Sequence, residues 1–175
     1  MHSRKSVTGI EARISHDDYY LIMARIAALR STCVRRTVGC ILVDADYRVL
    51  STGYNGVPSG EPHCIDSPCE GANDPSGDTT RCRAIHAEIN AVKPLLDNPG
   101  CQRVVRAYIS VAPCLACAEY LWSKCKRLHE VHVIRSYPDT HGVQFLQKMG
   151  VIVTIHEYIL SVNLNVMMQI GERWR

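Results

Sequence analysis

The chain has 175 residues, of which 46% are hydrophobic and 21% charged, ordinary values for a globular protein with one core. Its formal net charge of +3 is too small to indicate a nucleic-acid or membrane partner by itself. The N-terminal residues lack the apolar segment of a signal peptide, and no apolar run reaches the roughly 18 residues of a membrane helix. We therefore expect a soluble, cytoplasmic protein.

The first third of the chain predicts a helix followed by a β-hairpin. From residue 16, HDDYYLIMARIAALRS repeats apolar residues with helical spacing, and Asp17 or Asp18 is the expected N-cap. Two β-rich runs follow, VGCILV at 38–43 and YRVLSTGYN at 47–55. The short DAD between them predicts a tight turn.

A long irregular segment interrupts this regular pattern. Residues 56–82 are rich in Gly, Pro, Ser and Asp and show no sustained periodicity. A structureless loop of this length is uncommon in a compact domain unless it is functional or tied down. Three of the nine cysteines of the chain lie in it. Because nine is odd and a cytosolic protein keeps its thiols reduced, we expect metal ligation or burial for the cysteines and no disulfide framework.

The rest of the chain predicts alternating helices and strands. A helix that opens at RAIHAEINAV and kinks near Pro94 precedes a strand at 103–111, and a helix starts just after Pro113. A strand at 130–134, a helix ending at Gly150 and a strand in VIVTIHEY complete the order. We predict one α/β domain over residues 1–175, with a three-layer α/β/α arrangement and a five-stranded mixed sheet. Residues 159–175 are given no role.

Two short motifs supply the side chains for chemistry. HAE places His86 two residues before Glu88, and PCLAC places Cys114 three residues before Cys117. Residues two apart point to nearly opposite sides of a helix, so a site that uses both His86 and Glu88 must lie off the helix end. We predict that His86, Cys114 and Cys117 bind a zinc ion whose fourth position is left for water, as in catalytic sites.

Glu88 is predicted to lie beside this zinc and outside its ligand set. H-x-E followed by P-C-x-x-C is the signature of zinc-dependent deaminases, whose glutamate is a general acid and base. Zinc lowers the pKa of a bound water toward neutrality. Glu88 would accept that proton, and would return protons from the water to the ring nitrogen and to the departing ammonia. A purely structural zinc needs no such residue, which argues against a non-enzymatic scaffold.

The motifs HAEINAV and APCLACA, with STGYNGVPSG upstream, resemble the deoxycytidylate (dCMP) deaminase family of the cytidine deaminase-like fold. The resemblance implies hydrolysis of dCMP to dUMP and ammonia, which supplies thymidylate synthesis. It further implies that Asn55 hydrogen-bonds the sugar and that Ala87 and Tyr137 lie near the nucleotide. Arg135 or Arg35 is the expected partner of the 5′-phosphate, because an arginine fork suits phosphate.

The resemblance also implies assembly and regulation. Members of the family are often hexamers that dCTP activates and dTTP inhibits, with Mg²⁺ accompanying the nucleotide. Tyr54, Asn55 and Gly56 are the candidate effector residues.

A second, structural zinc is expected near the insertion, as in some family members. Four thiolates form a closed zinc site, and metal binding would offset the ordering entropy of a long loop. His63 is an alternative to one of the four ligands. The candidate cysteines are Cys33, Cys64, Cys69 and Cys82.

Two alternatives share the catalytic motif. A polynucleotide deaminase, such as a tRNA adenosine deaminase, would need a more basic surface or tail than EYILSVNLNVMMQIGERWR provides, so no nucleic-acid partner is expected. A deaminase of dCTP or of a modified dCMP would differ in pocket shape and phosphate contacts.

Overall fold

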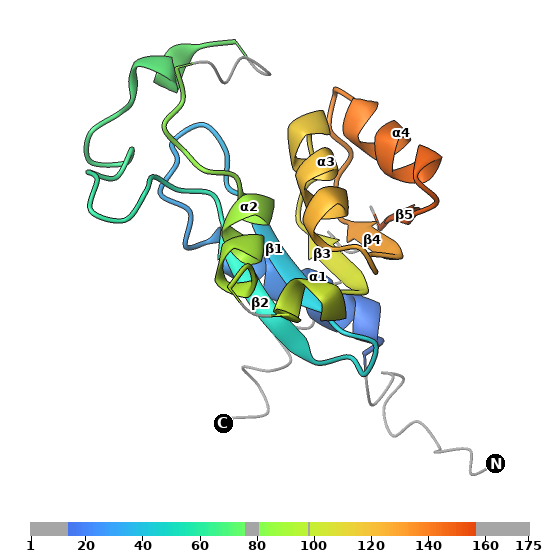
Figure 1. Ribbon diagram of the computed structural model, residues 1–175. Coiled ribbons are helices and arrows are strands. Elements are labelled where there is room, and N and C mark those ends of the chain that lie inside the picture. The colour runs from blue at the N-terminus through green and yellow to red at the C-terminus, as the bar shows by residue number, and fades with distance from the viewer. Residues whose placement is uncertain (1–13, 76–80, 98, 157–175) are drawn as a thin grey trace, which may run out of the picture.

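A computed structural model describes residues 14–75, 81–97 and 99–156 of the chain (Figure 1). The C-terminal tail, including the segment 159–175, lies outside the described residues. None of the helices in the described ranges has the length and apolar character needed to cross a membrane.

Five strands form one mixed sheet with the order β2-β1-β3-β4-β5. The strand β1 pairs antiparallel with both β2 and β3, whereas β3, β4 and β5 run parallel to one another. The predicted five-stranded mixed sheet is therefore confirmed. The strands are β1 (Gly39–Val43), β2 (Val49–Tyr54), β3 (Arg106–Ile109), β4 (Glu130–Val133) and β5 (Ile152–Ile155).

Helices cover both faces of the sheet, as predicted (Figure 1). One face carries α1 (His16–Ala28). The other carries α2 (Ala87–Val92), α3 (Leu115–Lys124) and α4 (His141–Lys148). Short 3₁₀ helices occupy Glu70–Asn73, Lys93–Leu95 and Pro99–Arg103.

Alternation along the strands divides the core into two parts. In β1, Cys40 and Leu42 pack toward α2 and α3, whereas Ile41 and Val43 pack toward α1. Successive side chains of a strand point to opposite faces, so a strand buried on both faces reads as a continuous apolar run. The sheet thereby separates the α2–α3 side from the α1 side, where Tyr108 of β3 is buried.

The predicted ends of two elements, the helix α1 and the strand β3, were wrong. The N-cap of α1 is Ser15, whose Oγ accepts the N–H of Asp18 at 3.0 Å; Asp17 and Asp18 lie inside the first turn, where their charge favours the helix dipole. The strand predicted at 103–111 is shorter at both ends. Arg103 ends a 3₁₀ helix, and Ser110 uses its hydroxyl to accept the N–H of Gly39 at 3.1 Å.

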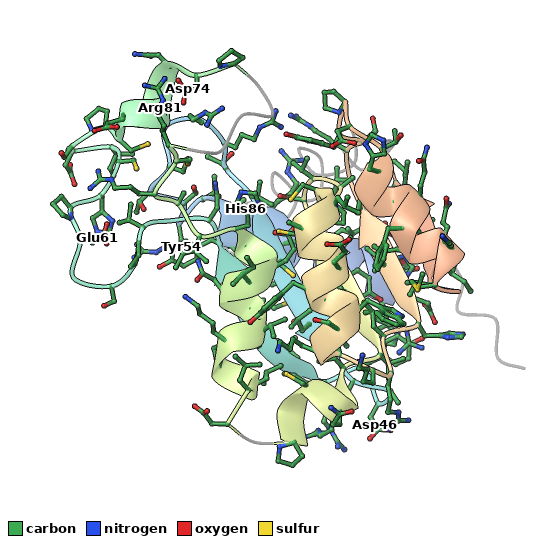
Figure 2. The ribbon with its side chains drawn as sticks, turned by 45° about the horizontal axis from the view of Figure 1, so that its top comes forward. Asp46, Tyr54, Glu61, Asp74, Arg81 and His86 are labelled. Atoms are coloured by element: carbon green, nitrogen blue, oxygen red, sulfur yellow. The ribbon has the colours of Figure 1, made fainter. Side chains whose placement is uncertain are left out.

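The insertion leaves and rejoins the fold at one point. Gly56 and Ile85 form an antiparallel bridge in which each N–H donates to the other carbonyl, at 3.1 and 2.8 Å. Between them the chain extends away from the sheet, and Figure 2 shows Asp74 and Arg81, which form an ion pair, at its far end. Arg35 donates to the carbonyl oxygens of residues 74 and 75 and ties the loop to the segment after α1.

Candidate active site

The candidate zinc ligands lie at the N-termini of two neighbouring helices. His86 is the N-cap of α2, Cys114 is the N-cap of α3, and Cys117 lies in the first turn of α3. Both helices pack on the same face of the sheet, so their N-termini come together. The N–H groups free at a helix start and the helix dipole both favour a thiolate there.

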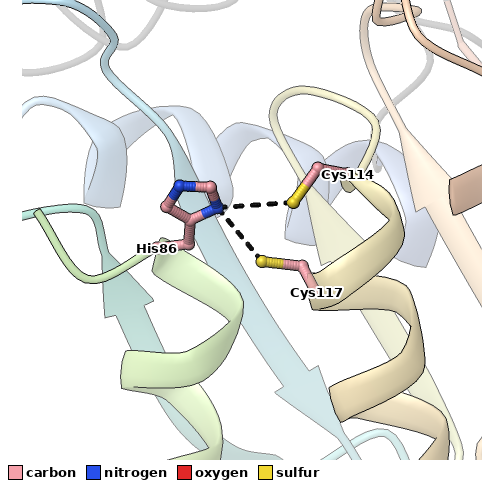
Figure 3. Close-up of side chains that lie close together, drawn as sticks. All are labelled: His86, Cys114 and Cys117. Atoms are coloured by element: carbon pink, nitrogen blue, oxygen red, sulfur yellow. Dashed lines mark hydrogen bonds between the residues drawn. The ribbon is translucent and has the colours of Figure 1, made fainter. Parts of the chain in front are cut away.

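The three side chains converge (Figure 3). Nδ1 of His86 lies 3.2 Å from Sγ of Cys117 and 3.6 Å from Sγ of Cys114. A tetrahedral zinc bound about 2.1 Å from nitrogen and about 2.3 Å from sulfur places these atoms about 3.6 Å apart. The spacing and the donor set therefore fit a zinc ion.

The ligand group stabilises negative charge on sulfur. Hydrogen bonds from the Cys117 thiol and from His86 lower the pKa of Cys114 to about 4. The same contact with Cys114, together with burial, raises the pKa of Cys117 well above its usual range. The hydrogen bond to Cys114 also raises the pKa of His86. A metal ion at this position would take the place of the shared protons.

Glu88 lies at the edge of this group and is not part of it. It is the second residue of α2, only 3% of it is exposed, and it hydrogen-bonds Cys117. Burial raises the pKa of its carboxyl, since a charged group loses its hydration there. A carboxyl tuned upward in this way is suited to accept and return a proton near neutral pH.

A pocket opens in front of the ligand group. Its wall combines residues of the motif helices with residues from the segment between α1 and β1, from the end of β2, from the insertion and from the segments after β3 and β4. They are Cys33, Arg35, Arg36, Val38, Asn55, Cys82, Ala84, His86, Ala87, Glu88, Val111, Ala112, Cys114 and Tyr137.

One arginine in the wall of this pocket, Arg36, was not predicted from the sequence. Arg36 places its guanidinium carbon 4.5 Å from the ring centre of Tyr137, and both line the pocket. Arg35 also lines it, although it bonds the insertion backbone. Arg135 lines a separate cavity with Arg25 and Ser110. The only signal for Arg36 was its position in the pair RR, which does not tell the two side chains apart.

Asn55 joins two segments that form the pocket. Its Oδ1 accepts the N–H of Val38 at 2.7 Å, and its Nδ2 donates to the carbonyl of Arg36. The residue is buried and lies beyond the end of β2. It therefore positions Arg36 in addition to lining the pocket.

The candidate effector residues divide between two hollows. Tyr54 and Gly56 line a hollow formed with insertion residues 57–63, whereas Asn55 lines the pocket at the zinc ligands. His63 is exposed and also lines the hollow formed by Tyr54, Gly56 and residues 57–63.

The four candidate cysteines of the second zinc site, Cys33 and the three cysteines of the insertion, lie near one another. Cys69 hydrogen-bonds both Cys64 and Cys82, and Cys33 lies close enough to these two residues to contribute to the raised pKa of each thiol. The four sulfur atoms do not all lie within 4.8 Å of one another, unlike the donor atoms of the two candidate metal-binding groups found among the described residues. The backbone N–H of Arg83 lowers the pKa of the Cys69 thiol, whereas burial raises that of Cys64.

A three-layer α/β/α fold with a His-Cys-Cys group and a buried glutamate at two helix N-termini defines a cytidine deaminase-like protein. The sequence profile of the cytidine and deoxycytidylate deaminase zinc-binding region matches residues 14–131. The chain belongs to this family.

Relatives of known function are similar over part of their length. The chain is 37% identical over 158 residues to the deoxycytidylate deaminase of Schizosaccharomyces pombe, which covers 86% of this chain and 46% of that protein. Identity to the Saccharomyces cerevisiae deoxycytidylate deaminase is 39% over 112 residues, or 61% of this chain and 34% of that one. The chain thus spans less than half the length of either yeast protein.

A phage relative is matched over most of its length. The deoxycytidylate deaminase of Mycobacterium phage D29 is 38% identical over 120 residues, which are 63% of this chain and 88% of the phage protein. The crystal structure of a dCMP deaminase from the cyanophage S-TIM5 in complex with dCMP and dUMP superposes with a TM-score of 0.64 at 23% identity, covering 83% of this chain and 99% of that one. This likeness shows the fold.

Proposed function

We propose that the protein catalyses the hydrolytic deamination of dCMP to dUMP and ammonia and so supplies dUMP for thymidylate synthesis. The observation that carries the proposal is a buried glutamate, Glu88, beside a three-residue zinc-ligand group at the wall of one pocket. The names of the yeast and phage relatives support dCMP as the substrate.

The roles at the reacting centre follow from position and protonation. His86, Cys114 and Cys117 hold zinc, which when bound lowers the pKa of a water molecule toward neutrality. The Glu88 carboxylate accepts the water proton. It delivers this proton to the ring nitrogen of cytosine, and then takes the second proton of the added water and delivers it to the amino group, which departs as ammonia. Its burial supports this role because a carboxyl with a raised pKa can hold the proton between the two transfers.

The rest of the pocket is assigned to the nucleotide. Ala87 and Tyr137 pack against the base and its surroundings, and Asn55 faces the sugar. We assign the 5′-phosphate to Arg36, in preference to Arg135, because Arg36 lines the same pocket as Glu88. The ring of Tyr137 holds the guanidinium by a cation–π contact.

A structural zinc is assigned to the insertion. The contacts of Cys69 with Cys64 and Cys82, and the burial of Cys33, support a four-thiolate site. Zinc would draw the four sulfurs into a tetrahedron. A Cys64→Ser variant should lose zinc and reduce the protease resistance of residues 57–84, whereas unchanged zinc and protease resistance would exclude the site.

Regulation and assembly are part of the proposal. The hollow lined by Tyr54 and Gly56 is assigned to a nucleotide effector, dCTP or dTTP, with Mg²⁺. A hexamer is expected, and light scattering of the purified protein measures the assembly directly.

The deciding experiment measures ammonia release by the zinc-loaded protein with dCMP, dCTP, CMP and deoxycytidine, with and without added dCTP effector and Mg²⁺. Selective turnover of dCMP is the expected result. Arg36→Ala should raise KM for dCMP at least about tenfold, the scale of one lost charge-assisted hydrogen bond. Arg135→Ala is the matched control and should leave KM unchanged.

Two results would contradict the proposal. Equal turnover of deoxycytidine and dCMP would remove the phosphate from substrate recognition. Absence of turnover with zinc bound would favour a base presented within a polynucleotide, which a tRNA stem-loop substrate would test.

A further inference from the structure

A second group of metal-binding side chains lies on the α1 side of the sheet, away from the candidate active site. Asp17 is in the first turn of α1, His132 is in β4, and His156 directly follows β5. One donor atom of each lies within 4.8 Å of the others. Both histidines are 6% exposed. We call these three residues the α1-side cluster.

The two imidazoles of the α1-side cluster are already oriented toward each other. Nδ1 of His132 lies 3.0 Å from Nε2 of His156, and Nε2 of His132 lies 3.2 Å from a carboxylate oxygen of Glu130. Since a carboxylate only accepts, His132 donates from Nε2 and turns the lone pair of Nδ1 toward His156. A carboxylate behind the imidazole is the usual partner of a metal-ligating histidine.

Other contacts hold the cluster in place. The His132 ring stacks on Tyr108, with the ring centres 4.8 Å apart, and the Tyr108 hydroxyl donates to Asp17 at 2.8 Å. The backbone N–H of His156 donates to the carbonyl of Val133 at 2.7 Å. All three ligands are thus fixed by the fold before any ion binds.

Carboxylates around the cluster supply negative charge. Oδ1 of Asp17 lies 3.9 Å from Nε2 of His132, and the charges of Asp17 and Asp18 both act on His156. Among the described residues, Oδ1 of Asp18 is a buried oxygen with no hydrogen-bond partner. Such an oxygen is costly to bury, and the positive charge of a nearby cation would offset part of that cost.

We propose that Asp17, His132 and His156 bind a divalent first-row transition ion, with Asp18 nearby to complete its charge balance. Two imidazoles with carboxylates suit zinc and its neighbours better than magnesium or calcium. A nitrogen separation of 3.0 Å fits two ligands each about 2.1 Å from one ion. The ion would replace the proton shared by the rings and tie α1 to β4 and β5. No active-site residue contributes, so the proposal does not depend on the deaminase assignment.

Zinc counting tests the site in the full chain. The reduced, chelator-treated protein is loaded with Zn²⁺, desalted and analysed for metal. Wild type should retain one zinc per chain more than Asp17→Asn and His156→Gln. His129→Gln is the matched control, because His129 is exposed just before β4, and it should retain as much zinc as wild type.

Cobalt distinguishes this site from the thiolate sites. Both cluster variants should lose one Co²⁺ per chain while the sulfur-to-cobalt charge-transfer band stays unchanged. Equal metal in wild type, Asp17→Asn and His156→Gln would overturn the proposal and leave the cluster a hydrogen-bond network, as would a loss confined to the charge-transfer band. If His156→Gln does not fold, Asp17→Asn decides alone, because it keeps the size of the side chain.

Discussion

At the scale of single residues, Glu88 is held where an ionised carboxylate is unfavourable. Its side chain is buried beside Cys117, and burial raises its pKa. A buried acid without a function would be replaced at little cost by an apolar or amide side chain. Its burial at the second residue of α2 therefore supports the proposed role in proton transfer.

Replacing Glu88 should separate chemistry from structure. We expect Glu88→Gln to lower kcat for dCMP by at least about 100-fold, because the amide cannot shuttle protons. Zinc content should stay at the wild-type level, since Glu88 is not in the ligand group. Single-turnover kinetics and metal analysis measure the two effects.

The exposed Glu119 on α3 offers a matched control. Glu119→Gln makes the same chemical change and should leave kcat unchanged. Retention of more than a tenth of the wild-type rate by Glu88→Gln would exclude Glu88 as the proton carrier.

At the scale of elements, α4 supports the loop that carries Cys114. A Cβ atom added at Gly142 would lie 2.2 Å from the carbonyl oxygen of Pro113 and 2.8 Å from the carbonyl carbon of Cys114. Those atoms are backbone, so either α4 or the ligand loop would have to move. We expect Gly142→Ala to weaken zinc binding about tenfold or more, the scale of a lost supporting contact around a metal ligand.

A second glycine provides the comparison for Gly142. Gly150 has φ +83, and no atom of the residues that the structure describes lies within 4 Å of a Cβ added there. Gly150→Ala should lower stability by about 1 kcal/mol through backbone strain and leave zinc affinity intact. Competition titration with a chelator, alongside thermal unfolding, gives both quantities. Equal zinc affinity in the two variants would mean that α4 does not position Cys114.

The β1–β2 hairpin contains an acid that makes stability depend on pH. Burial alone would raise the pKa of Asp44, but the N–H groups of Asp46 and Arg48 and the Arg103 guanidinium outweigh it and hold the pKa below its ordinary value. The stabilisation is thus complete above the unfolded pKa, near 4, and is lost as the pH falls through the lower, folded pKa.

Asp44→Asn should lower the free energy of unfolding by about 1–2 kcal/mol at pH 7. The difference from wild type should shrink as the pH falls below about 4, which denaturant titrations at several pH values would measure. Asp46→Asn removes a carboxylate that is 70% exposed and should have little effect. A difference that grows toward low pH would contradict the assignment.

The sequence was informative where local pattern determines structure. A continuous apolar run marked β1, and the H-x-E and C-x-x-C spacings marked the residues that converge at the candidate zinc site. For the phosphate it offered Arg35 or Arg135 and did not indicate Arg36. That choice depends on how Asn55 holds the backbone of Arg36, a contact between segments far apart in sequence.

The α1-side cluster shows the same limit. Asp17 or Asp18 was expected to be the N-cap of α1; because Ser15 takes that position, Asp17 accepts a hydrogen bond from Tyr108 instead. His132 and His156 read as single histidines within or after strands, and only the parallel pairing of β4 with β5 brings them together.

At the scale of the whole molecule, the insertion can be removed in principle without cutting the sheet. Gly56 and Ile85 exchange two hydrogen bonds, the arrangement that flanks a two-residue hairpin turn. We expect a variant with Asn-Gly in place of residues 57–84 to fold and to keep zinc at His86. Its KM for dCMP should rise, because Cys82 and Ala84 leave the pocket wall.

Circular dichroism, metal analysis and steady-state kinetics of this deletion variant test each part. The control for length alone is an insertion of the same length and amino-acid composition whose residues, including the cysteines, are placed in a different order. Loss of the folded state on deletion would show that the insertion belongs to the folding core.

The paired ends of the insertion also bear on how such a protein can diverge. For the sheet, the number of residues between Gly56 and Ile85 is almost a free variable, since loop-closure entropy grows only slowly with length. Residues near the end of the loop nevertheless form part of the wall of the candidate pocket. A change in the length or sequence of this one loop can therefore reshape the pocket wall while the residues at the N-termini of α2 and α3 stay the same.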